Sequence, residues 1–286
     1  MNDYSDGEKP WTNSALTRLG KRIRDGGVTP DVAAEYSEVM AWYNDLAIDV
    51  QARIESLDFT SLLGADAVVE ITSRAKTIDT LGDKLRRDRG MALPSIQDIA
   101  GVRVDASMTL TQQMHVAQAI AELFDHGARA VKDLRSAPHS GYRALHVWLR
   151  LRGRVEVQVR TVFQSEWANA YESIADLLGR EIRYDEYLPD NADAAELVRA
   201  MRTLSSEEIA GLEVLLDAIP VANVSSSDFL SRVRELAIDR GVAPDVLAAI
   251  EKSSGGASVQ IVLEEMLTAS LRVLRYGLTG LPREEG

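Results

Sequence analysis

The chain has 286 residues, of which 45% are hydrophobic and 27% are charged, as is typical of a globular protein with one large domain or two smaller ones. The absence of cysteine excludes disulfides, thiolate zinc sites and cysteine nucleophiles, and four histidines do not favour a histidine-rich metal cage. A net charge of −12 argues against a general nucleic-acid binder, which needs a broad positive surface. A local basic cleft remains compatible with that charge.

Neither a membrane span nor a signal peptide is expected. The sequence has no run of eighteen apolar residues, and its start, Met1–Pro10, is polar and acidic rather than basic and then apolar. We therefore expect a cytoplasmic protein with no membrane partner.

Residues 1–61 are expected to form a helical N-terminal region. A short helix is predicted over Trp11–Asp25. A second helix start is predicted at Thr29-Pro30-Asp31, which combines a hydroxyl N-cap, a proline at the first helical position and an acid in the first turn. Apolar residues three or four apart continue this helix to about Leu57, and we interpret their stripe as a packing surface.

Residues 62–185 are expected to form an α+β domain with a mixed sheet flanked by helices. The predicted strands are Val68–Ser73, Gly101–Ala106, Ala128–Leu134, Ala144–Leu151 and Arg154–Arg160. The predicted helices are Thr77–Arg89, Thr109–Phe124 and Thr161–Leu178. Strict βαβ winding is not expected, because adjacent strands occur without a helix between them. The last two strands are close enough in sequence for an antiparallel hairpin.

Residues 186–286 are expected to form a helical C-terminal region. Ser205–Glu208 matches a capping box and predicts a helix start, Gly241 lies at an expected helix end, and Ala243-Pro244-Asp245 predicts another start. Ser258–Tyr276 is amphipathic. No catalytic spacing is visible, so we interpret this region as a module for packing, oligomerisation or partner binding.

Basic residues gather where the first predicted strand meets the next helix. Thr80, Lys84 and Arg87 lie three or four apart and share a helix face, while Arg74 and Lys76 project from the strand end. Cations that converge at a helix start can hold a polyphosphate. A solvated basic face has the same pattern, and this stretch alone does not decide between the two.

Three further stretches each have two interpretations. Asp98 precedes a strand, where a carboxylate can hold a metal at a sheet edge or form a turn. Tyr142 ends a loop rich in proline, serine and glycine, where its ring can stack on a base or anchor the loop. Alternation along a strand places Glu156, Gln158 and Arg160 on one face, which indicates either a polar site or the wetted face of an antiparallel sheet.

Four motifs follow one another along the chain: R-x-K-x(3)-T-x(3)-K from Arg74, D-I-x-G-x-R from Asp98, S-G-Y-R-x-x-H from Ser140 and V-E-x-Q-x-R-T from Val155. In this order they resemble the synthetase domain of RelA/SpoT-type alarmone synthetases, whose single-domain members are called small alarmone synthetases. The resemblance covers roughly Leu62–Asp185 and implies a nucleotidyltransferase-like fold. It also implies transfer of pyrophosphate from ATP to the 3′-hydroxyl of GDP or GTP, which gives ppGpp or pppGpp and AMP.

The resemblance implies a role for each matching residue. Asp98 and Glu156 would bind Mg²⁺, the expected cofactor, and Glu156 would also take the proton of the attacking hydroxyl. The donor residues that the resemblance places around ATP are Arg74, Lys76, Thr80, Lys84 and Arg103, and Arg87 is added to them because it shares the helix face of Thr80 and Lys84. The acceptor residues are Tyr142, which would stack on guanine, together with His146, Gln158 and Arg160. Such a transfer depends on alignment and charge neutralisation rather than on a covalent nucleophile, which suits a chain without cysteine.

The chain departs from the family pattern at Pro138, where members usually carry a lysine that binds the acceptor's phosphates. The residues that can substitute for it are Lys132, Arg135, His139 and Arg143. The His-Asp metal motif of the family's hydrolase domain is absent from the sequence, so we expect the chain to make rather than degrade its product.

Two other functions remain open. A toxic relative, with an antitoxin partner, would place pyrophosphate on adenosine nucleotides or on the 3′ end of tRNA, and the acidic charge weakens the tRNA version. A catalytically inactive nucleotide-sensing module is the third function, which the presence of Asp98 and Glu156 disfavours. Small alarmone synthetases are often tetramers built through terminal helices, so the resemblance also implies a homo-oligomer.

Overall fold

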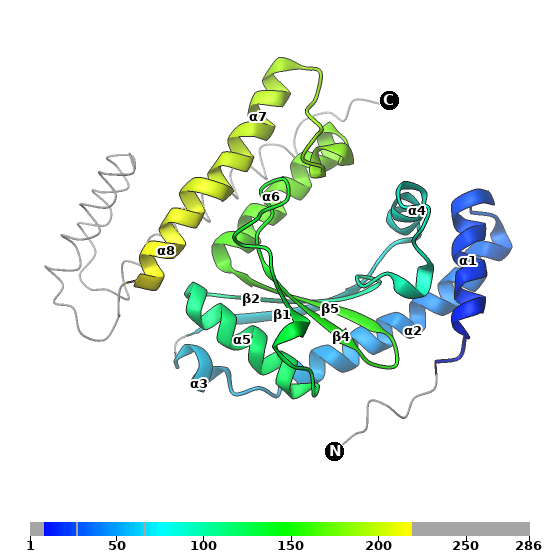
Figure 1. The fold of residues 1–286 in the computed structure, drawn as a ribbon, viewed down its shortest axis with the longest axis horizontal. Helices are drawn as coiled ribbons and strands as arrows, with labels where there is room; N and C mark the ends of the chain where they lie inside the picture. The colour runs from blue at the N-terminus through cyan, green and yellow to red at the C-terminus, as the bar shows by residue number, and fades with distance from the viewer. Residues whose placement is uncertain (1–8, 27, 66, 219–286) are drawn as a thin grey trace, which may run out of the picture. The chain divides into compact units, whose positions relative to one another are not determined.

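The computed structural model describes residues 9–26, 28–65 and 67–218, and it confirms the α+β fold as a mixed five-stranded sheet flanked by helices (Figure 1). The described chain forms two compact units that are interleaved in the sequence. The first unit holds residues 9–106, 114–133 and 145–159, and the second holds residues 107–113, 134–144 and 160–218. The chain therefore passes repeatedly from one unit to the other.

The helices and strands up to Leu178 lie within a few residues of their predicted bounds. The first helices are α1 (Asn13–Gly26), α2 (Pro30–Ile54), α3 (Phe59–Leu63), α4 (Ile78–Arg87) and α5 (Leu110–Leu123), of which only the short α3 is unpredicted. The strands are β1 (Val69–Ala75), β2 (Ala100–Ala106), β3 (Val131–Asp133), β4 (Leu145–Arg150) and β5 (Arg154–Thr161). Strand β3 is shorter than predicted because residues 128–130 form a 3₁₀ turn, η2, in which the Ala130 N–H donates to Gly127.

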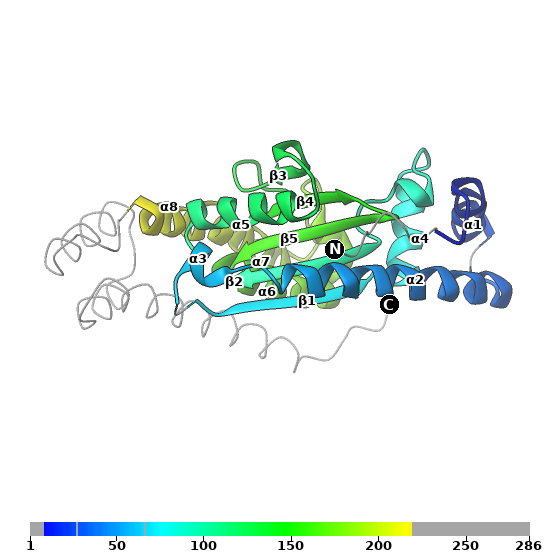
Figure 2. The ribbon, with the colours of Figure 1, turned by 90° about the horizontal axis from the view of Figure 1, so that it is seen from below.

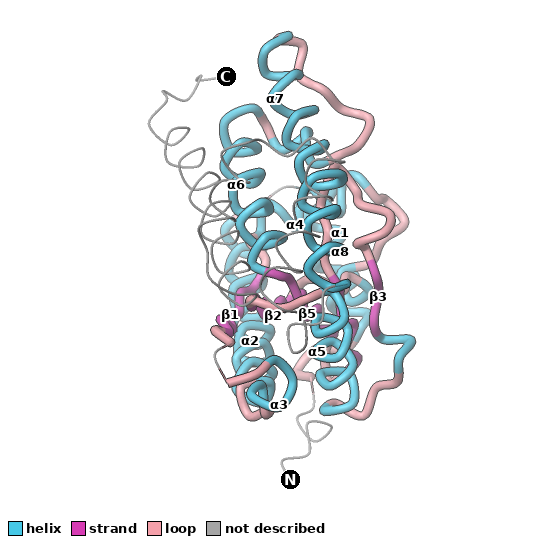
Figure 3. The backbone as a smooth tube through the Cα atoms, turned by 90° about the vertical axis from the view of Figure 1, so that its left-hand side faces the viewer, coloured by secondary structure: helices cyan, strands magenta, loops and turns pink. Residues whose placement is uncertain are grey.

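Helix α2 supplies much of the core of the first unit. It begins at Pro30 as predicted, because Thr29 is extended and proline fits the first helical turn. Its stripe of apolar residues is buried, with Leu46 and Val50 fully inaccessible, and the helix packs along β1 and β2. Figures 1, 2 and 3 show α2 and α5 on the same face of the sheet.

The register of the sheet separates an apolar face from a polar one. The strand order is β1-β2-β5-β4-β3, and β4 and β5 form the predicted antiparallel hairpin. Val147 lies opposite Val157, whereas the next pair along is Trp148 and Glu156. Because opposite residues share a face and successive residues alternate, the valines lie in the core and the polar side chains line the other face.

The second unit is built on helices that follow β5. They are α6 (Val162–Leu178), η3 (Arg180–Arg183), α7 (Ala192–Thr203), η4 (Leu204–Ile209) and α8 (Ala210–Ala218). Helix α6 begins with a capping box, in which Thr161 accepts from the backbone of Gln164 and the Gln164 side chain accepts from the backbone of Thr161. The apolar core of this unit includes Phe163, Trp167, Tyr171, Ile174, Val198, Met201 and Ile209.

The predicted helix start at Ser205 is wrong. Residues 192–218 form one continuous helical segment, in which η4 is a π-helical turn. The Ser205 hydroxyl does not cap a helix, because it donates to the carbonyl of Gly141 instead (2.5 Å). The helical hydrogen bonding continues through this turn, since the Ala210 N–H donates to the carbonyls of Ser205 and Glu207.

The remaining C-terminal predictions, at Gly241, at Ala243-Pro244-Asp245 and over Ser258–Tyr276, lie outside the described residues. Among the helices that the structure does describe, none combines the length and the apolar character needed to cross a bilayer.

Candidate active site

Glu156 of β5 lies at the centre of the polar face of the sheet. Its Oε2 lies 3.2 Å from the indole nitrogen of Trp148 and 3.3 Å from Nδ1 of His146, both on β4. Its Oε1 accepts a hydrogen bond of 3.1 Å from the amide of Gln158, two residues along the same strand. Strand register explains this cluster, since Trp148 is directly opposite Glu156 and His146 is directly opposite Gln158.

Glu156 is enclosed on this face, unlike a residue on an ordinary solvated strand face, whereas Trp148 directly opposite is 39% exposed. Glu156 is only 7% exposed, and Gln158 is half-buried. Burial of the Glu156 carboxyl raises its pKa, but the hydrogen bonds and charge of His146 and the bond from Gln158 outweigh burial and leave the pKa below its ordinary value. Glu156 is therefore an ionised, buried and hydrogen-bonded carboxylate at neutral pH.

Asp98, in the turn before β2, is held by two lysines. Its Oδ2 is 2.6 Å from Nζ of Lys76, and its Oδ1 is 2.7 Å from Nζ of Lys84 on α4. Burial raises the pKa of the Asp98 carboxyl, but the two ammonium groups outweigh this and lower the pKa to about 2. The structure thus brings two of the predicted phosphate-binding cations onto one of the predicted metal-binding acids.

The backbone fixes Lys76 beside the turn that carries Asp98. The Lys76 N–H donates to the carbonyl of Ile99 (2.9 Å), and the Lys76 carbonyl accepts from the hydroxyl of Tyr36 on α2 (2.6 Å). Helix α4 then begins at Ile78, which places Lys84 two turns into the helix. The strand end, the turn and the helix therefore converge on Asp98.

Asp98 and Glu156 line the same small cavity, which has a volume of about 40 Å³. The other residues that line it are Lys76, Gly101, Val102, Arg103 and Gln158. This volume holds a water molecule or an ion but not a nucleotide, whose sites are typically several hundred Å³. A ligand of nucleotide size would fit into this cavity only if side chains that line it moved.

The donor set fits a magnesium ion that completes its coordination with water and phosphate. Mg²⁺ prefers carboxylate oxygens, takes one or two of them and keeps several waters. Asp98 and Glu156 supply such oxygens from two segments. In the part of the chain that the structure describes, no group of three or more His, Asp or Glu side chains could form a closed metal site.

The other predicted donor residues surround the same region of the first unit. Thr80 lies in the first turn of α4, where its hydroxyl bonds to the carbonyl of Thr77 (2.9 Å), and Arg87 is exposed in the last turn of that helix. The backbone of Arg74 on β1 pairs with Gly101, and that of Arg103 on β2 pairs with Thr72. Arg103 also lines the cavity.

The loop of residues 134–144, which carries Tyr142 and is called the acceptor loop below, belongs to the second unit and contains a tight turn. Ser140 and Gly141 both have positive φ, at 51° and 84°, and the Tyr142 N–H donates to the carbonyl of His139 (2.9 Å). Positive φ at both central residues defines a type I′ turn, which favours glycine. Asp185 accepts from the Ser140 N–H and pairs with the His139 ring.

The remaining acceptor residues of the second unit are engaged within the protein. Tyr142 is half-buried and packs against the helical core. Arg143 is buried and lies 2.6 Å from Oε2 of Glu213. Arg160 is 2% exposed and donates to the hydroxyl of Ser165 (3.2 Å).

Comparisons with known proteins identify the family. A protein-family model described as "Region found in RelA / SpoT proteins" matches residues 73–208 of the chain. An uncharacterised protein of Mycobacterium tuberculosis is 48% identical over 206 residues, which cover 69% of this chain and 73% of that protein. The chain belongs to the RelA/SpoT family. The RelA/SpoT match extends past Asp185 through α7 and into η4, beyond the four motifs seen in the sequence.

Solved structures similar to this RelA/SpoT protein include two from Bacillus subtilis. Small alarmone synthetase 1 has a TM-score of 0.48 and 17% identity, over 70% of this chain and 98% of that one. Small alarmone synthetase 2 has a TM-score of 0.46 and 22% identity, over 63% of this chain and 95% of that one.

The sequence does not indicate several residues that contact the candidate site. It predicts Trp148 only as part of a strand, whereas the hairpin register places Trp148 opposite Glu156. Asp185, Ser205 and Glu213 contact the acceptor loop or the end of β5 from 45 or more positions away. No short-range signal indicates these contacts: Asp185 and Glu213 are single polar residues in otherwise ordinary stretches, and the local pattern at Ser205 predicts a helix cap instead.

Proposed function

We propose that the protein is a magnesium-dependent (p)ppGpp synthetase, which transfers pyrophosphate from ATP to the 3′-hydroxyl of GDP or GTP. The observation that carries this proposal is the placing of Asp98 and Glu156 on one cavity, with Lys76 and Lys84 bound to Asp98. Two acids for a hard cation and two cations for phosphates are what pyrophosphate transfer needs. Family membership supports the same chemistry.

The reaction joins the 3′ oxygen of the acceptor to the β-phosphorus of ATP and breaks the bond between that phosphorus and the oxygen bridging to the α-phosphate. AMP leaves with that oxygen, and the proton of the 3′-hydroxyl passes to Glu156. An ionised carboxylate can accept this proton, and the lowered pKa keeps Glu156 ionised at neutral pH. A magnesium ion, when bound, would neutralise charge on the phosphate oxygens.

Lys76 and Lys84 are proposed to exchange partners when ATP binds. Both ammonium groups neutralise Asp98 in the structure described. The triphosphate offers them a stronger concentration of negative charge, and their movement would leave the Asp98 carboxylate for the cation. Thr80, Arg74, Arg87 and Arg103 complete the proposed donor set.

For the acceptor, we propose that the guanine base stacks on Tyr142 and that His146 and Gln158 contact the nucleotide. Lys132 is a candidate for the lysine that Pro138 replaces, because it lies on β3 directly opposite His146. Its ammonium group is 5.3 Å from the ring centroid of Trp148. Pro138 also supports a second candidate function, in which the acceptor is an adenosine nucleotide.

The test is transfer of label from γ-labelled ATP, with Mg²⁺, to GDP, GTP, AMP, ATP and deacylated tRNA in separate reactions. We expect labelled GDP and GTP, and no label when Glu156→Gln is used. Label only in AMP, ATP or tRNA would correct the acceptor. If the protein binds nucleotides but labels none of these acceptors, the enzyme hypothesis is wrong and a nucleotide-sensing module is the better interpretation.

A further inference from the structure

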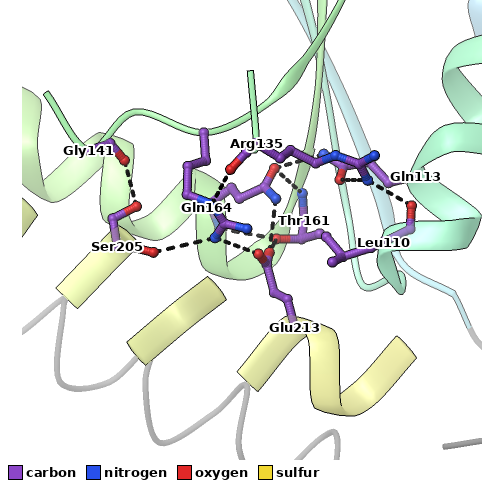
Figure 4. A network of polar contacts seen from close by, with 9 residues as sticks. Leu110, Gln113, Arg135, Gly141, Thr161, Gln164, Ser205 and Glu213 are labelled. Carbon is purple, nitrogen blue, oxygen red and sulfur yellow. Dashed lines mark hydrogen bonds and ion pairs between the residues drawn. The ribbon is translucent and has the colours of Figure 1, made fainter. Parts of the chain in front are cut away.

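The second unit contains a buried polar network centred on Glu213 of α8 (Figure 4). Its Oε1 accepts from the hydroxyl of Thr161 (2.5 Å) and from the amide of Gln164 (3.0 Å), and its Oε2 lies 2.6 Å from Arg143. The side chains of Arg143 and Glu213 are 3% and 2% exposed. Removing either partner of such a pair would leave a buried charge uncompensated, which is strongly destabilising.

The same network holds the beginning of the acceptor loop. The Gln113 amide donates to Oε1 of Gln164 (2.7 Å), and Arg135 donates to Gln113 (3.2 Å) and to the carbonyl of Leu110 (2.9 Å) (Figure 4). Arg143, at the end of the loop, donates in turn to the carbonyl of Arg135 (3.3 Å). Both ends of the loop are therefore tied to one set of buried side chains.

Ser205 holds the turn between these two ends. Its hydroxyl donates to the carbonyl of Gly141 (2.5 Å), and its own carbonyl accepts from Arg143 (3.4 Å). Gly141 packs so closely that a Cβ atom there would lie 2.8 Å from the Trp167 ring. Tyr142 lies between Gly141, which Ser205 holds, and Arg143, which pairs with Glu213. Its backbone is therefore held on both sides.

We propose that Ser205 and Glu213 are positioning residues that set the affinity for the acceptor nucleotide. This inference rests on the proposed function, because it takes Tyr142 as the residue that stacks on the acceptor base. Loss of either contact would release the backbone on one side of Tyr142, whereas the proposed phosphate-binding residues Lys76 and Lys84 belong to the other unit. The expected signature is selective: acceptor binding weakens, and ATP binding does not.

Ser205→Ala tests this with the smallest change, the loss of one hydroxyl. We expect the Kd of the full chain for GDP, measured by calorimetry, and the KM for GDP to rise about fivefold, as for one lost hydrogen bond. The KM for ATP should stay unchanged. The matched control is Ser206→Ala, because Ser206 is exposed and its hydroxyl bonds to Arg202 of its own helix (2.9 Å); it should alter neither constant.

Glu213→Gln tests the ion pair, with Glu208→Gln as the control that removes the same charge from an exposed position on the same helical segment. We expect a larger rise in the KM for GDP than in Ser205→Ala, at least about tenfold, with the KM for ATP unchanged. Circular dichroism establishes whether Glu213→Gln is folded. If it is not, the serine pair decides.

The outcomes separate this inference from the proposed function. An equal rise in both KM values, a fall in kcat alone, or unchanged GDP binding in Ser205→Ala would overturn the positioning role while the unaltered protein remains active. If the unaltered protein neither binds nor labels GDP, the proposed function fails, and this inference fails with it.

Discussion

Asp98 keeps its charge through contacts with two lysines. A carboxylate whose folded pKa is lowered contributes stability above its unfolded pKa and loses it as the pH falls through the folded value. For Asp98 the two values are 3.8 and about 2. The stabilisation, roughly 2 kcal/mol, should therefore be complete at neutral pH and disappear between about pH 4 and pH 2.

Asp98→Asn tests this electrostatic contribution. The variant should unfold more easily than the unaltered protein at pH 7, and the difference in free energy of unfolding should shrink as the pH falls from about 4 toward 2. Urea titrations at several pH values measure it. A difference that stays constant over this range would show that the two lysines do not hold the carboxylate as described.

Trp148 is predicted to tune the proposed base. Its indole N–H donates to Oε2 of Glu156 (3.2 Å), and a bond to the charged form of an acid lowers the pKa of that acid. Trp148→Phe keeps an aromatic ring but removes the indole donor, so the pKa of Glu156 should rise. The acidic limb of the pH profile of kcat/KM should then move to higher pH, and an unmoved limb would contradict the role of the indole.

The sequence predicted that Glu156 and Gln158 share a strand face, but it did not predict the partners of these residues. Alternation placed Glu156 and Gln158 on one face, and that face does carry the cavity. The contact of Glu156 with Trp148 follows from the hairpin register, which the sequence left open. The ion pair of Arg143 with Glu213 depends on long-range packing, so no local pattern could have indicated it.

At the scale of elements, one residue, Thr161, makes several structural contacts at the junction between β5 and α6. Thr161 ends β5, caps α6 by accepting from Gln164, and donates to Glu213. A helix cap typically contributes about 1 kcal/mol to the free energy of unfolding, and a second hydrogen bond to a buried charged group adds to this contribution.

Thr161→Ala should therefore lower the free energy of unfolding by about 2 kcal/mol or more. Asn191→Ala is the matched comparison, because Asn191 caps α7 by accepting from Ala194 in an exposed position. Asn191→Ala should lower the free energy of unfolding by about 0.5–1 kcal/mol. Thermal unfolding of the two variants measures the difference, and equal losses would mean that the bond to Glu213 contributes nothing.

The elements that the sequence identified are those with short-range signals. Thr29-Pro30-Asp31 marked the start of α2 correctly, since proline geometry is local, but the predicted capping bond is not formed because the Thr29 hydroxyl donates to the Asp31 carboxylate instead (2.5 Å). Ser205–Glu208 has an equally local signal, yet the packing of Ser205 against Gly141 overrides it and the helix continues as a π turn. Tertiary contacts decide whether such a local signal starts a helix, and these contacts cannot be predicted from the local pattern of a single sequence.

At the scale of the whole molecule, the interleaved units make the second unit dependent on chain that follows Asp185. Residues Val198, Met201 and Ile209 complete the core around α6, and the carbonyl of Met201 accepts from the Trp167 indole (2.7 Å). The region from residue 62 to 185, which the sequence motifs outlined, includes none of these.

A chain shortened to end at Asp185 should therefore lose the ordered core of the second unit. We expect a broad thermal transition and a red-shifted tryptophan emission, compared with a chain that ends at Ala218 and keeps these contacts. Circular dichroism and fluorescence of the two chains provide the measurement. The same sharp transition and the same Tm in both would show that α7 and α8 are dispensable for folding.

The bond between Ser205 and Gly141 joins positions 64 residues apart in the chain. During translation, the S-G-Y-R segment leaves the ribosome several seconds before the helix that shapes it, at a synthesis rate of about 5–20 residues per second. The turn reaches its final conformation only when that helix has followed. A nascent chain would thus carry the residues proposed to bind ATP well before its acceptor loop is fixed, and the order of synthesis would delay the onset of activity until the second unit is complete.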